Sequence, residues 1–207
     1  YVLDVAALAH EKGLYTVYVS NSFVTDEALA LLRGHIDVLC SDIKSMEDAF
    51  YRKICARASV QQVLQSIKTA HELGIHVETR TNVIPDHNDS GDNLRAIAQW
   101  IHNNLGAQSP WHITRFHPAY QMADVASTPV ATLEQAARIG YQAGLSQVYV
   151  YADKGCDCAS ENAPVGSYLP RWSALHETNK CADPCCGEEG ILLSRYEREA
   201  GLPAERG

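Results

Sequence analysis

One pattern occurs four times in this sequence and limits what the chain can fold into. In each occurrence a helix-like segment is followed by a glycine and then by an apolar run with the composition of a β-strand. Glycine is favoured just past a helix end because the backbone there turns left-handed, a conformation that penalises a Cβ atom. Each occurrence therefore predicts a helix that ends before the glycine and a strand that begins after it. The segments are HEKGLYTVYVS, LLRGHIDVLCS, HELGIHVETRTNV and YQAGLSQVYVY, with Gly13, Gly34, Gly74 and Gly144.

A fifth apolar run, WHITRFH, follows an amphipathic segment around residue 97. The sequence thus predicts alternating helices and strands, with strands near residues 14–20, 36–42, 75–84, 111–117 and 147–151. Helix starts are expected at Thr25, at Asp89, and at the capping boxes Ser59-x-x-Gln62 and Thr132-x-x-Gln135. Strands joined by helices run parallel, so two α/β architectures remain, an open doubly wound sheet and a (β/α) barrel.

Polar side chains stand at the C-terminal end of nearly every predicted strand. A ring of such groups is how a (β/α) barrel builds its active-site end, whereas a doubly wound sheet concentrates them at one switch point. The sequence therefore favours a barrel, and because five strands are too few to close one, it predicts a partial barrel. These polar residues are Asn21, Asp42, Lys44, Arg80, Asn82, Arg115 and His117.

The alternating pattern stops near Asp153. It predicts a barrel part over residues 1–152 and a loop-rich, cysteine-rich tail over residues 153–207. Four thiolates could complete a tetrahedral zinc site in this tail, although the spacings are irregular and some thiols could equally be free. The candidate metal ligands are Cys156, Cys158, Cys181, Cys185 and Cys186.

Composition limits the partners and the compartment. The formal charge of -8 comes without a basic stripe, which argues against a nucleic-acid partner. No apolar run approaches the roughly 18 residues of a membrane span, so we expect no membrane partner. Five of the seven cysteines lie in the last quarter of the chain. This clustering and the odd count favour metal ligands in a reducing compartment and predict a cytoplasmic protein.

Asp42 and Lys44 are two residues apart at the end of an apolar run, so their side chains are expected to point the same way. Three interpretations follow. The pair could be a surface ion pair that contributes little, or a site in which the lysine binds an anion and the aspartate a cation or a donor. Alternatively, Lys44 could form a Schiff base, as in barrel aldolases. The spacing alone does not choose among them.

The third predicted strand has one wholly polar face. Such a face either lines a cavity or pairs its charges internally. Because arginine suits carboxylates, Arg80 makes an anion in that cavity a plausible hypothesis. Arg115 and His117 are likewise expected to share one face of the fourth strand. The polar face of the third strand comprises His76, Glu78, Arg80 and Asn82.

Four segments resemble, in order, the second half of a radical SAM enzyme. They are GLYTVYVSNSFVTDEAL, VLCSDIKSMEDAFYRKIC, VETRTNVIPDHNDS and PWHITRFHPAY. The resemblance is to the AmmeMemoRadiSam-system radical SAM proteins, which are themselves similar to pyruvate formate-lyase activating enzyme. It covers about residues 1–151 and, with a first residue other than Met, implies further chain upstream of Tyr1.

The family implies a partial barrel that binds a [4Fe–4S] cluster and S-adenosylmethionine (SAM). Reduction by the cluster cleaves SAM to methionine and a 5′-deoxyadenosyl radical, which abstracts hydrogen from a substrate. Because activating enzymes act on a protein, the resemblance implies a protein substrate or a Memo-like partner. The cofactor carries this chemistry, so no residue of the chain is assigned as a catalytic acid or base.

Five residues are carried over to the SAM site by matching motif. Lys44 resembles the lysine that contacts the SAM carboxylate, and Asp42 the aspartate that can hold a cation near SAM. His117 matches a histidine near the adenine, and Asn21 lies in the block that corresponds to the family's TNG. Arg80 matches a strand arginine that faces the cofactor cavity.

Three departures accompany the resemblance. Ser22 stands where the family has the glycine of TNG, and Asp86 replaces the glycine of a VIPGxND block. The CxxxCxxC signature that ligates the cluster is absent, and Cys181-x-x-x-Cys185 better resembles a lengthened C-terminal CPxCG knuckle. We therefore interpret the chain as the C-terminal portion of a radical SAM enzyme that is inactive alone. The rival hypotheses are a Schiff-base aldolase and a non-catalytic, metal-stabilised interaction module.

Overall fold

The computed structural model describes residues 1–56 and 59–151 of the chain. Every predicted strand is present and lies inside its predicted range. The predicted tail and its candidate metal ligands lie outside the described residues. Within them, no helix is both long and apolar enough to cross a membrane. The elements are α1 (Val2–Glu11), β1 (Val17–Ser20), α2 (Asp26–Leu32), β2 (Val38–Asp42), α3 (Asp48–Ile54), α4 (Val60–Glu72), β3 (His76–Val83), α5 (Gly91–Leu105), β4 (Trp111–Arg115), the 3-10 turn η1 (Tyr120–Met122), α6 (Val130–Gln142) and β5 (Val148–Tyr151).

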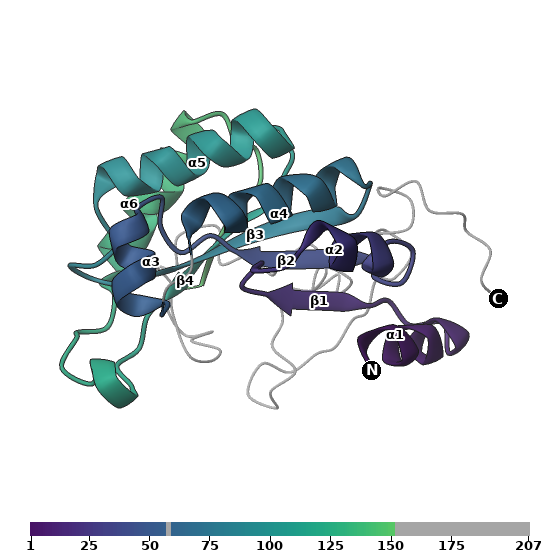
Figure 1. The fold of residues 1–207 in the computed structure, drawn as a ribbon. Helices are drawn as coiled ribbons and strands as arrows, with labels where there is room; N and C mark the ends of the chain where they lie inside the picture. The colour runs from purple at the N-terminus through teal and green to yellow at the C-terminus, as the bar shows by residue number, and fades with distance from the viewer. Residues whose placement is uncertain (57–58, 152–207) are drawn as a thin grey trace, which may run out of the picture.

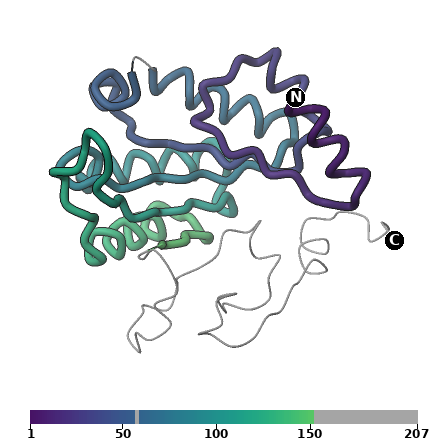
Figure 2. The backbone as a smooth tube through the Cα atoms, turned by 90° about the horizontal axis from the view of Figure 1, so that it is seen from below, coloured from purple at the N-terminus to yellow at the C-terminus, as the bar shows by residue number. Residues whose placement is uncertain are grey.

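The five strands form one sheet in which every neighbouring pair is parallel. The strand order is β1-β2-β3-β4-β5, so the chain crosses the sheet in one direction without reversing. Figure 2 shows this progression from purple at one edge to green at the other. A doubly wound sheet requires a reversal, whereas right-handed crossovers in one direction place successive helices on one face. The fold is therefore an open part of a (β/α) barrel, as predicted.

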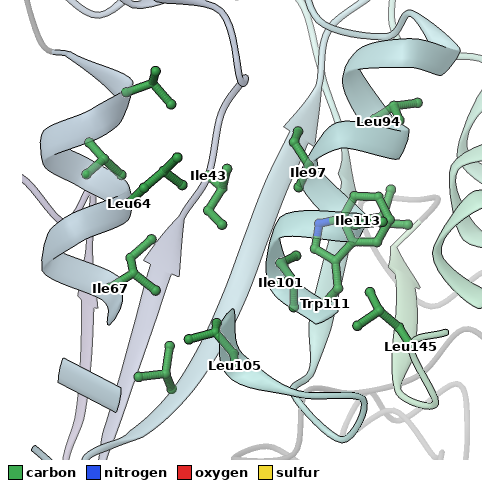
Figure 3. Close-up of a cluster of buried hydrophobic side chains, with 14 of the residues drawn as sticks. Ile43, Leu64, Ile67, Leu94, Ile97, Ile101, Leu105, Trp111, Ile113 and Leu145 are labelled. Carbon is green, nitrogen blue, oxygen red and sulfur yellow. The ribbon is translucent and has the colours of Figure 1, made fainter. Parts of the chain in front are cut away.

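The hydrophobic core lies between the sheet and the helices α2, α4, α5 and α6, which cover the same face (Figure 1). Helix α4 contacts β3, and α6 contacts both β4 and β5. The side chains that meet in this layer are fully buried (Figure 3). They include Ile43, Ile67, Leu94, Ile97, Ile101, Trp111 and Ile113.

The helix ends follow the glycine pattern more closely than the predicted caps. Gly13, Gly34, Gly74 and Gly144 all have positive φ, as expected just past a helix end. At the helix starts, Thr25 accepts a hydrogen bond from the Ala28 amide at 3.3 Å and caps α2 as predicted.

Of the other three predicted starts, one is right in position and two are wrong. Ser59 precedes α4 but makes no capping hydrogen bond with its side chain. Helix α5 is capped by Ser90 rather than Asp89, because the Asp89 carboxylate instead accepts from the Asp86 amide in the preceding turn. Thr132 lies inside α6, which already begins after Pro129, whose carbonyl accepts from the Thr132 amide at 3.0 Å.

Candidate functional site

The sheet face opposite the helices, here called the inner face, carries the polar side chains. Asp42 pairs in register with Arg80, and Arg80 pairs with His112 on the next strand. Register partners in neighbouring strands point to the same face, as do residues two apart in one strand. Asp42, Glu78, Arg80 and His112 therefore share the inner face. Asp42 lies at the C-terminal end of β2 and Arg80 in the middle of β3. Glu78 and His112 lie nearer the N-terminal ends of β3 and β4.

Asp42, Lys44 and Arg80 form one ion cluster. Lys44 Nζ donates to one Asp42 oxygen at 2.7 Å, and Arg80 Nε donates to the other at 2.8 Å. The hydrogen bond to Asp42 is the main cause that raises the pKa of Arg80. The Lys44 and Arg80 side chains keep about a third of their surface exposed, at 32% and 37%, whereas Asp42 keeps 14%. Two cations around one carboxylate leave a net positive charge, which suits one further anion.

Two predicted site residues lie apart from this cluster. Asn21 is exposed just beyond β1, and its side-chain oxygen accepts from the Phe23 amide at 3.1 Å, the contact of a turn former. His117 was predicted to close the fourth strand, but β4 ends at Arg115. Among residues 1–56 and 59–151, no hydrogen bond or ion pair joins Asn21 or His117 to the cluster.

The predicted pairing of Arg115 with His117 on a site-facing strand is also wrong. Arg115 Nε donates to the Thr128 carbonyl at 2.8 Å, in the segment that leads to α6. The inner face of β4 carries the alternate residues, His112 and Thr114, which pair in register with Arg80 and Asn82. Arg115 therefore lies on the opposite face of β4 from these two residues. The prediction relied on the large polar side chains at the end of the strand and not on the residues that precede them.

A second buried cluster on the inner face was missed. Glu78 is fully buried, and its two carboxylate oxygens contact His112 Nε2 at 2.8 Å and His76 Nε2 at 3.2 Å. The Tyr149 ring stacks on His112 at 5.1 Å, and the Tyr151 hydroxyl lies 3.5 Å from His112 Nδ1. Alternation along WHITR would have indicated His112, because His112 and Thr114 are the polar residues that alternate with apolar ones in this strand. The same two residues pair in register with the polar face of β3.

Burial raises the pKa of Glu78 more than any other single cause. The hydrogen bonds and positive charges of His112 and His76 together outweigh it and hold this pKa below its ordinary value of 4.5. Burial, followed by the charge of Glu78, raises the pKa of Tyr151, so its hydroxyl stays protonated. The polar face of β3 thus pairs part of its charge internally, at Glu78, and leaves Arg80 partly exposed.

Two turns beside the site keep a left-handed backbone without glycine. Ser22 has φ 57° and Asp86 has φ 60°, at the two positions where the family motifs carry glycine. The Ser22 hydroxyl donates to the buried Ser41 hydroxyl at 2.6 Å, which helps to hold that turn against β2. Both residues thus adopt the left-handed backbone that glycine favours.

A family comparison identifies the fold. The model of the radical SAM superfamily matches residues 1–101. Residues 1–101, just under half of the chain, therefore belong to a radical SAM superfamily domain. A protein of Methanocaldococcus jannaschii, uncharacterized protein MJ0808, is 37% identical over 175 residues, which are 84% of this chain and 50% of that protein.

Two pyruvate formate-lyase-activating enzymes extend the radical SAM comparison. The enzyme of Clostridium pasteurianum is 25% identical over 103 residues, 50% of this chain and 42% of that enzyme. The crystal structure of a domain of the enzyme from Bacteroides vulgatus superimposes with a TM-score of 0.64 at 15% identity. That match covers 72% of this chain and 89% of the domain, and it supports the fold alone. The chain spans about half the length, or less, of its curated relatives.

The radical SAM family implies SAM and a [4Fe–4S] cluster, which we compared with the donors present. The free cysteines among the described residues are Cys40 and Cys55, fewer than the thiolates a cluster needs. No group of three or more metal-binding side chains occurs in this part of the chain either. The described residues therefore do not fit the cluster. The cationic cluster of Lys44, Asp42 and Arg80 does fit the carboxylate of SAM.

Proposed function

We propose that the inner face binds SAM, with Lys44 and Arg80 holding its carboxylate. The observation that carries this proposal is the pair of partly exposed cations that Asp42 holds side by side, Lys44 just after β2 and Arg80 within β3. Ionised donors make strong hydrogen bonds to carboxylates. Asp42 orients both cations; a bound cation would compete with them for the same two oxygens.

Asn21 and His117 complete the proposed SAM site at its rim. Asn21 follows β1 and His117 follows β4, so both lie at the C-terminal ends of strands, on either side of the cluster. In the proposal His117 lies near the adenine of SAM, as the matched family position does, and Asn21 lines the same site from the block that corresponds to TNG. Within the described residues, no hydrogen bond or ion pair engages the His117 ring.

The proposal for the whole protein is a radical SAM enzyme. In this superfamily SAM, together with a [4Fe–4S] cluster, is the source of a radical that abstracts hydrogen. The similarity to activating enzymes supports a protein substrate, and the AmmeMemoRadiSam resemblance adds a Memo-like partner. The cluster ligands would come from outside residues 1–56 and 59–151, with zinc in the tail as a further part of the proposal.

The Schiff-base alternative is less well supported. A nucleophilic lysine must lose its proton and is usually activated by desolvation or by a neighbouring cation. Lys44 Nζ instead lies 2.7 Å from the Asp42 carboxylate and is partly exposed. The neighbour of this amine is thus an anion rather than a cation, and its surroundings are not desolvated.

Lys44→Met is expected to lower the affinity for S-adenosylhomocysteine about ten- to hundredfold, because a charged hydrogen bond contributes about 1.5–3 kcal/mol. The affinity for 5′-methylthioadenosine, which lacks the aminocarboxylate arm, should not change. Neither ligand carries the sulfonium charge of SAM, so the comparison isolates the arm. Isothermal titration calorimetry on the full chain measures both. Equal loss for both ligands, or no loss, would contradict the proposed site.

The chain is also expected not to cleave SAM reductively by itself, because its sequence has no CxxxCxxC. The measurement is release of 5′-deoxyadenosine after incubation with iron, sulfide and dithionite. Release at the rate of an intact radical SAM enzyme would show that the tail cysteines or another set can ligate a working cluster.

A further inference from the structure

The segment that carries Lys44, between β2 and α3, is fixed by a buried amide in the turn that follows β3. Asn88 is 2% exposed and lies in the turn after β3. Its Nδ2 donates to the Lys44 carbonyl at 2.6 Å and to the Asn82 carbonyl at 2.9 Å. Its Oδ1 accepts from the Ile84 amide at 2.6 Å. One side chain thus joins the Lys44 backbone to the end of β3.

A second buried amide holds the residues that follow Lys44. Asn93, in the first turn of α5, is 5% exposed. Its Oδ1 accepts from the Met46 amide at 2.8 Å and from the Ser45 hydroxyl at 3.0 Å. Its Nδ2 donates to the Asn88 carbonyl at 2.7 Å. The two amides are therefore linked, and together they tie the segment after β2 to β3 and α5.

The Lys44 backbone is held at its amide as well. Lys44 N donates to the hydroxyl of the buried Tyr51 at 3.1 Å. Burial is the main cause that raises the pKa of Tyr51 to about 12, so this hydroxyl stays neutral. Both polar groups of the Lys44 backbone are thus bonded to buried side chains, while Asp42 directs the ammonium.

This arrangement fixes two cations relative to each other. Arg80 is on β3, four residues before Ile84, and Asn88 links the same stretch of β3 to Lys44. A lysine loses rotamer freedom when it binds a ligand, and holding its backbone in advance reduces the ordering that remains. Loss of the link would let the Lys44 segment move away from Arg80, although neither cation would be altered.

We infer that Asn88, supported by Asn93, is a positioning residue for the carboxylate arm of the ligand and acts through Lys44. The inference rests on the proposed function. Loss of a positioning residue lowers the affinity for ligands that carry the carboxylate arm and leaves the affinity for ligands without it unchanged. This difference distinguishes Asn88 from an amide that only stabilises a turn.

The test is Asn88→Ser in the full chain, since serine is too short to bond both carbonyls. We expect affinity for S-adenosylhomocysteine to fall about three- to tenfold, and affinity for 5′-methylthioadenosine to stay constant. In the Lys44→Met background, Asn88→Ser should cause no further loss, because residues that act as a unit are not additive. If Asn88→Ser does not fold, Asn93→Ser provides the same measurement.

Ser109→Ala is the matched control. Ser109 is also buried, and its hydroxyl donates to the Leu105 carbonyl at 2.8 Å, but it precedes β4 at the opposite end of the sheet. It should lower stability slightly and leave the preference between the two ligands unchanged.

The outcomes separate the inference from the proposed function. The proposed site and the inference are both overturned if the wild-type chain binds S-adenosylhomocysteine no more tightly than 5′-methylthioadenosine. They are also overturned if Lys44→Met keeps the wild-type preference for S-adenosylhomocysteine. A preference that depends on Lys44 but survives Asn88→Ser overturns the inference alone. Equal loss for both ligands in Asn88→Ser assigns Asn88 a purely structural role.

Discussion

Glu78→Ala is expected to lower the free energy of unfolding by about 3–5 kcal/mol at neutral pH, because it leaves two buried or half-buried histidines without their shared partner. Glu78 is 0% exposed and His112 is 2% exposed, so water cannot replace the lost hydrogen bonds without entering the inner face. Urea unfolding followed by circular dichroism measures the change. A loss below about 1 kcal/mol would show that the pair contributes no more than a surface contact.

Glu78→Gln separates the charge from the shape of this side chain. The glutamine keeps an acceptor for His112, so the expected loss at neutral pH is about 1–2 kcal/mol. Glu78 has a folded-state pKa below its ordinary value of 4.5. Its charge therefore stabilises the fold above pH 4.5, and this contribution is lost as the pH falls through the lower folded-state pKa. The stability difference between wild type and Glu78→Gln should accordingly shrink in acid; a constant difference from pH 7 to pH 3 would contradict the assignment.

Trp111→Ala is expected to lower the free energy of unfolding by about 3–5 kcal/mol, the range for a fully buried aromatic side chain. Trp111 begins β4 and lies in the centre of the core between the sheet and α5 and α6 (Figure 3). Its indole nitrogen donates to the Thr81 hydroxyl at 3.0 Å, and that hydroxyl donates to the Ile43 carbonyl at 2.7 Å. The substitution thus removes core volume and one end of a buried hydrogen-bond chain.

Two further variants show which part of Trp111 matters. Trp111→Phe keeps most of the volume and removes the hydrogen bond, so it should cost about 1–2 kcal/mol. Trp100→Ala removes the same side chain from a half-buried position in α5 and should cost less than Trp111→Ala. Circular dichroism is the suitable probe, because tryptophan fluorescence changes with the substitution itself. Equal losses in Trp111→Ala and Trp100→Ala would contradict the central place of Trp111.

The fold could be predicted because its signals are local. A glycine such as Gly74 marks a helix end within a few residues of a strand start, and four of the five strands were located from that pattern. The grouping of Asp42, Lys44 and Arg80 was also accessible, because parallel strands bring their C-terminal ends to one edge of the sheet. Their geometry about one carboxylate, with one oxygen for each cation, needed the structure.

The rest of the site depends on signals that the sequence shows weakly. His112 was missed because its role follows from strand parity, and the end of β4 was placed two residues too late. Asn88 and Asn93 gave no signal, because their partners are backbone atoms of a segment more than forty residues earlier in the chain. Hydrogen bonds to distant backbone groups leave no spacing that a sequence can reveal.

The strand order has a consequence for how the sheet forms. Each strand pairs with the strand immediately before it in the chain, so every β–β contact closes a loop of about forty residues or fewer. Contact order is accordingly low for a parallel sheet, and low contact order accompanies fast folding. Each strand from β2 onward therefore leaves the ribosome after the strand with which it pairs has been synthesised. The sheet can then form one strand at a time, in the order of synthesis.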